Sequence, residues 1–105
     1  MTPEGKVKAA VKRVLSRIPE VWVHWPVQNG MGAPCLDAHG CYRGTYFAIE
    51  TKAPDKVPTP RQDETIRRIA AAGGLVMVIS SVEGAQNIKE RLEQHVRTVR
   101  HHSHK

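Results

Sequence analysis

Hydrophobic spacing along the chain alternates between the period of a helix and the period of a strand. Thr2-Pro3 is typical of a helix start, because a capping residue is followed by proline at the first helical position. The apolar residues after it recur three and four positions apart, as on one face of a helix, until Pro19 ends the run. These residues are Val7, Ala10, Val11, Val14, Leu15 and Ile18. The pattern predicts an amphipathic N-terminal helix.

Strand-forming residues dominate the next part of the chain. Residues 21–27 are rich in branched and aromatic side chains, and Pro26 places them at the edge of a sheet or beside a bulge. We expect Trp22 and Trp25 to be packing residues. Residues 29–34 contain two glycines and a proline, so they are predicted to form an irregular connection.

A hairpin is predicted in the middle of the chain. Residues 35–38 should form a short strand that turns at His39-Gly40 or at Arg43-Gly44 into a second strand, Thr45–Thr51. The turn can fall at either glycine on sequence grounds.

The second half of the chain alternates helix, strand and helix. Thr59-Pro60 repeats the N-terminal helix start, Gln62 completes a capping box with Thr59, and Gly73-Gly74 is a strong stop. Leu75–Ile79 is apolar at every position, which is typical of a strand in the middle of a sheet and parallel to a neighbour. Ser80-Ser81 with Glu83 begins the last helix. Its apolar positions are Val82, Ala85, Ile88, Leu92, Val96 and Val99.

The predicted order, α-β-β-β-α-β-α, implies an α/β fold whose mixed sheet has one right-handed crossover and is flanked by helices. With 105 residues the chain is expected to be a single domain over residues 1–96. Residues 97–105 form a basic, histidine-rich tail, which we expect to be a frayed helix end or a disordered arm.

The chain is strongly basic. It has 16 Lys and Arg against 10 Asp and Glu, a formal charge of +6 and a pI near 9.8, which suits a polyanionic partner such as DNA. The basic residues that we expect to contact DNA are Lys6, Arg43, Lys56 and Arg61. No apolar run approaches the roughly 20 residues of a membrane span. The opening residues lack the apolar core of a signal peptide, so we expect a cytoplasmic protein without a membrane partner.

Candidate chemistry is concentrated between Asp37 and Lys52. Side chains alternate along a strand, so Glu50 and Lys52 point to the same face. If Asp37 lies on the neighbouring antiparallel strand, two carboxylates and an ammonium converge. Carboxylate oxygens are ligands that Mg²⁺ prefers, and a lysine there lies near an attacking water. The sequence therefore predicts a site for one or two Mg²⁺ ions.

Two polar residues lie on the otherwise apolar stripes of the flanking helices. Glu4 precedes Val7 by three positions, and Gln62 precedes Ile66 by four. Each has a local explanation, as a first-turn acid favoured by the helix dipole and as a capping-box glutamine. Each could also reach the acidic site, and the residues alone leave both explanations open.

The two cysteines, Cys35 and Cys41, lie on either side of Asp37 and His39. A disulfide is not expected in a reducing cytosol, and the spacing does not match that of paired zinc ligands. Two ordinary thiols on adjacent strands are favoured, with structural zinc as the weaker alternative. The tail histidines are not expected to bind metal.

These motifs resemble those of the PD-(D/E)xK nuclease superfamily. Asp37 followed by Glu50-Thr51-Lys52 matches its Asp…(Asp/Glu)-x-Lys signature, and the surrounding sequence is similar to the small VRR-NUC endonucleases, particularly stand-alone forms from phage genomes. The surrounding matches are residues 32–34, 47–54, 59–62 and 72–74, and the similarity extends from Thr2 to about Ile88. The family more often has proline directly before the first acid, whereas here Pro34 lies three residues before it.

The resemblance implies a restriction-endonuclease-like αβββαβ core with an added C-terminal helix. It also implies a Mg²⁺-dependent deoxyribonuclease, with Mn²⁺ as a substitute, and a homodimer. Asp37 and Glu50 then match the metal-binding acids, together with the Thr51 carbonyl, and Lys52 matches the motif lysine. Glu4 and Gln62 match an acid and a glutamine on the family's flanking helices. We therefore expect both to belong to the catalytic residues, with Glu4 completing or extending the metal site.

Two further expectations concern the substrate and the class of protein. Relatives suggest a preference for branched or Holliday-junction DNA, which needs two active sites held in one dimer, and a phage-encoded copy would act in the host cytoplasm. The alternative, from another class, is a non-catalytic basic nucleic-acid-binding module in which the acids are structural.

Overall fold

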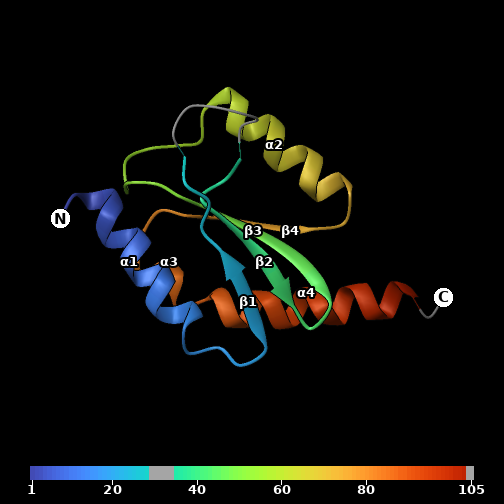
Figure 1. The fold of residues 1–105 in the computed structure, drawn as a ribbon. Coiled ribbons are helices and arrows are strands. Elements are labelled where there is room, and N and C mark those ends of the chain that lie inside the picture. The colour runs from blue at the N-terminus through green and yellow to red at the C-terminus, as the bar shows by residue number, and fades with distance from the viewer. Residues whose placement is uncertain (29–34, 104–105) are drawn as a thin grey trace.

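Four strands form one mixed sheet in the order β1-β2-β3-β4 (Figure 1). The computed structural model describes residues 1–28 and 35–103, so the predicted connection at residues 29–34 lies outside the described residues. The strands are β1 Val21–His24, β2 Ala38–Tyr42, β3 Thr45–Thr51 and β4 Leu75–Ile79. The first three pair in antiparallel fashion, and β4 pairs parallel to β3.

Helices cover both faces of this sheet. α1 (Pro3–Leu15), α3 (Val82–Ala85) and α4 (Ile88–Ser103) lie on one face, and α2 (Pro60–Ala71) lies on the other (Figure 1). The predicted α/β order is confirmed, except that Gln86 and Asn87 divide the last helix in two. The described part of the predicted tail, residues 97–103, continues α4 as a helix. None of the helices described is long and apolar enough to span a bilayer.

The core lies between the sheet and the helices α1, α3 and α4. Alternate residues of β3 and β4 point into it, and the stripe predicted for the first helix covers them. The fully buried side chains of greatest volume are Phe47, Ile49, Met77, Ile88, Leu92, Val7, Val11 and Thr51. The residues of β3 that point the other way, among them Glu50, face α2.

The hairpin turns at Arg43-Gly44, the second of the two predicted positions. Both residues have positive φ, at 50° and 83°, as two-residue hairpin turns require. The first candidate glycine, Gly40, is instead inside β2 because the neighbouring strand approaches it closely. A Cβ built there would lie 2.0 Å from the carbonyl oxygen of Trp22. The predicted strand at residues 35–38 is therefore wrong in its bounds, since β2 begins where that segment ends.

Two expectations about packing are also wrong. β4 pairs only with β3 among the described strands, so it lies at an edge of the sheet and leaves Val78 38% exposed. Met77 and Ile79 are buried because helices pack on the faces of β4 rather than because strands flank it. Trp22 is 63% exposed on the outer face of the edge strand β1, whereas Trp25 is half-buried and packs against the core as predicted.

Candidate functional site

The two predicted acids meet where β2 begins and β3 ends. Ala38 pairs with Ile49 in the antiparallel register, so Asp37, one residue before Ala38, lies opposite Glu50, one residue after Ile49. The main-chain N–H of Asp37 donates to Glu50 Oε1 over 3.2 Å. Strand register therefore brings together two carboxylates that are 13 residues apart in the sequence.

The carboxylate of Asp37 bonds to the end of β3. Its Oδ2 accepts from the main-chain N–H of Thr51 at 2.9 Å and from the Thr51 hydroxyl at 2.6 Å. Its Oδ1 accepts from Gln28 Nε2 at 3.0 Å. Because the N–H and C=O of one strand residue point to the same side, the Thr51 carbonyl also faces the Asp37 side of β3.

Glu50 is only 3% exposed, and both of its oxygens have partners. Besides the N–H of Asp37, its carboxylate accepts from Gln62 Nε2 at 2.8 Å and pairs with Lys52 Nζ at 3.4 Å. The Lys52 side chain is itself only 12% exposed, so the ion pair is largely shielded from solvent. Glu50 and Lys52 thus share a face, as the strand alternation predicts.

Gln62 combines the two explanations that its position left open. Its Oε1 accepts from the N–H of Thr59 at 2.9 Å, which completes the capping box at the start of α2. Its Nε2 donates to Glu50. One amide therefore joins the first turn of α2 to the acid on β3.

The surroundings of Glu50 disfavour its charged form. Burial, and then the neighbouring Asp37 carboxylate, raise the pKa of Glu50 above its ordinary value of 4.5, and the charge of Lys52 offsets only part of this rise. With both carboxylates ionised, the cluster has two negative charges and one ammonium to offset them. A divalent cation would neutralise the charge that remains.

The donor set fits Mg²⁺. Each carboxylate has about four lone-pair directions and accepts from three groups, so each retains acceptor capacity. Among the described residues no group of three or more His, Cys, Asp or Glu side chains could hold a metal. Two carboxylates with a nearby carbonyl are nonetheless usual for Mg²⁺, which keeps several waters and takes further ligands from substrate phosphates.

The remaining predicted residues lie at varied places. Glu4 is exposed in the first turn of α1, so the expectation that it lies on the buried stripe is wrong: the buried residues begin one turn later, at Val7. Its part in the metal site stays a prediction that the geometry does not support. Arg43 pairs with Glu20 at 3.4 Å. It lies in the turn before β3 begins, whereas Glu50 lies where β3 ends, so the two are at different ends of the strand.

The other predicted DNA contacts differ in how close they lie to the acids. Lys6 and Lys56 are exposed, and no described contact joins them to the site. Arg61 lines a cavity of about 170 Å³ together with Gln28 and Gln62, both of which bond to the acids. It is therefore the predicted basic residue that lies beside the site.

Sequence reasoning missed residues on the α1 side of the site. Gln28 holds Asp37, but nothing in the sequence beside it marks it as functional. Lys8 and Lys12 line a cavity that reaches Asp37. Their spacing of four residues signals a shared helix face, but the sequence does not show what lies opposite that face.

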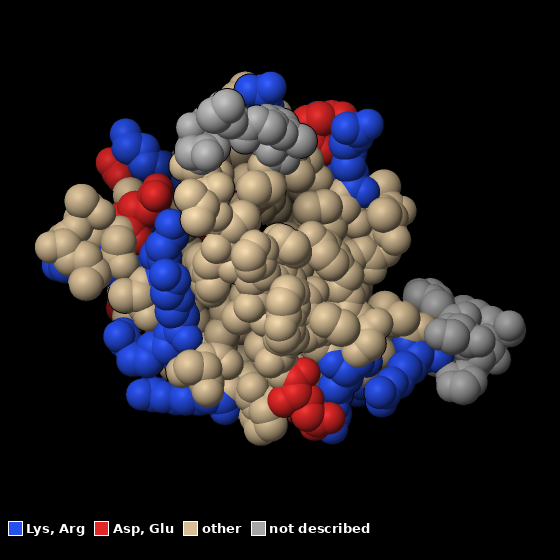
Figure 2. All heavy atoms as spheres, in the orientation of Figure 1, with Lys and Arg blue, Asp and Glu red and all other residues tan. Residues whose placement is uncertain are grey.

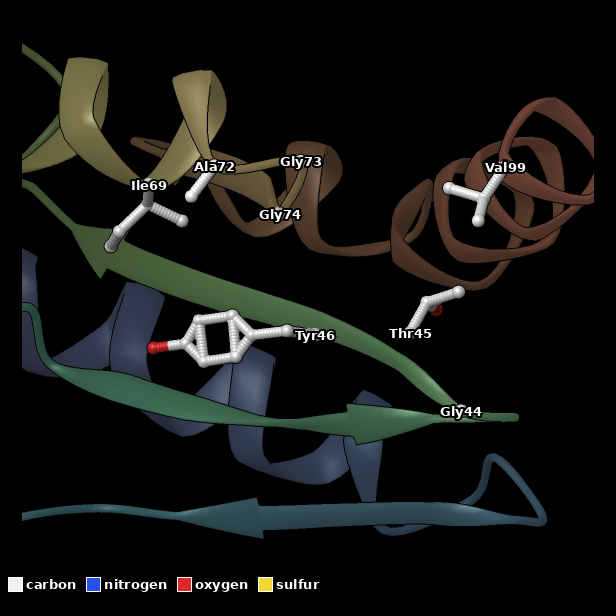
Figure 3. A pocket seen from close by; sticks show the side chains of 8 residues that line it. All are labelled: Gly44, Thr45, Tyr46, Ile69, Ala72, Gly73, Gly74 and Val99. Atoms are coloured by element: carbon white, nitrogen blue, oxygen red, sulfur yellow. The ribbon is translucent and has the colours of Figure 1, made fainter. Parts of the chain in front are cut away.

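A cavity elsewhere does not coincide with this chemistry. It has a volume of about 510 Å³ and lies where β3 begins, between the end of α2 and α4 (Figure 3). Tyr46 and Ile69 line it, but none of Asp37, Glu50 and Lys52 does. The acids mark the candidate site instead.

The raised pKa of Glu50 predicts a pH-dependent stability. The folded state binds this proton more tightly than the unfolded state, so Glu50 destabilises the fold increasingly as pH rises from about 4 through its raised pKa. Replacing Glu50 with Gln removes this titration. In metal-free buffer we therefore expect wild type to lose stability relative to Glu50→Gln as pH rises, measured by urea unfolding. A difference that is constant with pH would contradict the prediction, and the exposed Glu64→Gln serves as the control.

The comparisons with known proteins agree with this architecture. No family model matches the sequence. The curated proteins contain no match either. Among solved structures, the chain is similar to one described as "VRR_NUC domain", with a TM-score of 0.71 and 23% identity over 86% of this chain and 97% of that one. At that identity the likeness shows the fold, and the chain therefore has the fold of a VRR_NUC domain, consistent with the restriction-endonuclease-like core expected from its sequence.

Proposed function

We propose that this protein is a divalent-metal-dependent nuclease that hydrolyses phosphodiester bonds in DNA. The observation that carries the proposal is the pairing of Asp37 with buried Glu50, beside Lys52, at the end of β3. The same arrangement lies within a fold shared with a VRR_NUC domain structure. The net charge of +6 supports a polyanionic substrate.

The metal would be held by Asp37, Glu50 and the main-chain carbonyl of Thr51. When bound, a divalent cation supplies Lewis-acid chemistry that favours deprotonation of water and neutralises phosphate charge. Thr51 and Gln28 fix the Asp37 carboxylate, and Gln62 fixes that of Glu50. The chain thereby orients both carboxylates before substrate arrives, so little reorganisation is needed during the reaction.

Lys52 has a separate role in this proposal. Its ammonium lies 3.4 Å from Glu50 Oε2 and is therefore next to the proposed metal position. It would orient the attacking water or stabilise the negative charge that develops on the phosphate oxygens. The ion pair with buried Glu50 holds the Lys52 side chain in place.

The proposal is tested with purified protein and a panel of labelled DNAs. Linear, nicked, flapped and four-way substrates are incubated with Mg²⁺, with Mn²⁺ or with chelator. We expect cleavage only with metal, and calorimetric binding of Mn²⁺ that Asp37→Asn weakens roughly tenfold or more. Binding of DNA with neither Mn²⁺ binding nor cleavage would instead favour the non-catalytic binding module. The same panel, with light scattering, tests the predicted branched-DNA preference and homodimer.

A further inference from the structure

A second cavity opens beside the acids, between α1 and the segment after β1. Its volume is about 390 Å³, and its lining is mostly polar. The residues that line it are Lys8, Lys12, Trp25, Pro26, Gln28 and Asp37. Asp37 therefore belongs both to the carboxylate pair and to this cavity, which places the cavity directly next to the proposed site of cleavage.

Two lysine ammoniums lie over one indole ring in this cavity. Lys8 and Lys12 are one turn apart on α1, so they share a helix face. Lys12 Nζ lies 4.9 Å and Lys8 Nζ lies 6.0 Å from the centre of the Trp25 ring. Within residues 1–28 and 35–103, neither lysine forms an ion pair with a carboxylate. The cavity thus holds two cations whose described partner is an aromatic face.

Asp37 lies in the lining but forms no ion pair with either lysine within the described residues. Its carboxylate accepts hydrogen bonds from Thr51 and Gln28 instead. The two ammoniums repel each other, and a bound anion would relieve that repulsion. Several Lys and Arg side chains lie on the α1 side of the molecule in Figure 2, and others lie on its opposite side.

Trp25 holds these lysines in position. The indole is half-buried and packs against the core, so the ring is fixed by the fold. A cation over an aromatic face is attracted by the ring quadrupole, which keeps the ammoniums near the cavity in the absence of substrate. Trp25 is a positioning residue in this arrangement, and the two lysines are the groups that meet the ligand.

We propose that this cavity binds a backbone phosphate of the substrate strand next to the phosphate that is cleaved. The inference rests on the proposed function and names the group that anchors the strand. An ammonium donates hydrogen bonds and accepts none, so two of them in one cavity favour an anion. Because Asp37 also lines the cavity, a DNA strand that is bound for cleavage would bring its own phosphates next to the two lysines. Because lysines contacting phosphate read no bases, the anchoring is independent of sequence.

The decisive experiment measures DNA binding without cleavage. Binding of a labelled oligonucleotide is followed by fluorescence anisotropy in chelator over a range of salt concentrations. We expect Lys8→Ala combined with Lys12→Ala to weaken binding roughly tenfold, and to reduce the slope of log K against log salt by about one for the lost phosphate. The effect should be equal for oligonucleotides of different sequence. Lys89→Ala, an exposed lysine on α4, should bind as wild type does.

A second pair of measurements separates anchoring from chemistry. With Mg²⁺, the double variant should raise KM for DNA more than it lowers kcat. Trp25→Leu retains apolar volume but removes the ring, so it should weaken DNA binding several-fold while thermal unfolding reports on its fold. Should Trp25→Leu not fold, the double lysine variant decides alone.

Unchanged affinity and unchanged salt slope in the double lysine variant would overturn this inference, and so would an equal loss in Lys89→Ala. Wild type that binds no DNA would also overturn it. Wild type that binds DNA but never cleaves it would overturn the proposed nuclease, while the lysine comparison would still decide the anchoring site.

Discussion

Glu50→Gln is expected to reduce metal-dependent DNA cleavage by at least about 10³-fold, equivalent to about 4 kcal/mol of transition-state stabilisation. The glutamine side chain has the same size and its oxygen can still accept from the N–H of Asp37. The change removes the charge and keeps the volume, and it also removes the acceptor for Gln62 and Lys52. Without that charge, the pair of acids no longer forms a dianion for a divalent cation to neutralise. The measurement is single-turnover cleavage of labelled DNA with Mg²⁺, on protein whose circular dichroism matches wild type.

A matched control isolates the position from the substitution. Glu64→Gln makes the same chemical change on the exposed surface of α2, where Glu64 pairs with Arg67. That variant should cleave as fast as wild type. Because Glu50→Gln is purified identically, its inactivity would also exclude a contaminating nuclease. Cleavage by Glu50→Gln within tenfold of wild type would remove Glu50 from the chemistry.

Phe47→Ala is expected to cost about 3–5 kcal/mol of folding stability. The ring is fully buried, and it lies on the core face of β3 opposite Gly40, where a Cβ would come within 3.0 Å of the ring carbon Cζ. Truncation to alanine removes the packing of the ring against the core and leaves a cavity, and both effects destabilise the fold. Domains of this size have a free energy of unfolding of about 5–15 kcal/mol, so this one change removes a large part of it.

Urea unfolding of both variants measures the effect. Trp22→Ala is the control, because it removes a larger aromatic side chain from a strand position that is 63% exposed. We expect it to change the free energy of unfolding by no more than about 1 kcal/mol. A Phe47→Ala cost as small as that of Trp22→Ala would mean that the ring does not contribute to the core as described.

The parts of the fold that follow from local chemistry were predictable from the sequence. The cap at Thr2, the capping box at Thr59 and the bounds of β3 depend on residues a few positions apart, and all three are present. Gly40 could not be placed in the same way. Its role depends on the approach of a carbonyl from another strand, so the local pattern resembled a turn.

The residues of the candidate site also differ in whether local chemistry or long-range contacts place them. Glu50 and Lys52 share a face because side chains alternate along a strand, and this alternation can be read directly from the sequence. Asp37 reaches them through register, and Gln62 does so because its amide serves two partners at once. The wrong expectation for Glu4 shows the limit of helical period, which gives a direction around the helix axis but not the position at which the helix leaves the core.

The basic surface was the least predictable feature. Lysines on a helix are all charged and all solvated on sequence grounds, so Lys6 and Lys8 look alike. What distinguishes Lys8 is Trp25, which comes from a segment 17 positions further along the chain and lies beneath its ammonium. Only the packing of α1 against the segment after β1 reveals that contact.

The side chain of Asp37 also takes the place of a main-chain carbonyl as a hydrogen-bond acceptor. Where β2 has not yet begun, its carboxylate supplies the acceptor that a strand carbonyl would otherwise offer to the N–H of Thr51. Any chain with this sheet, with or without nuclease activity, would still need an oxygen at this position to close the end of its sheet. Lys52 is different, since its ammonium bonds to no main-chain group in the described residues. On the proposed function, loss of the lysine, rather than loss of the aspartate, would therefore be the earlier mark of a relative that no longer cleaves DNA.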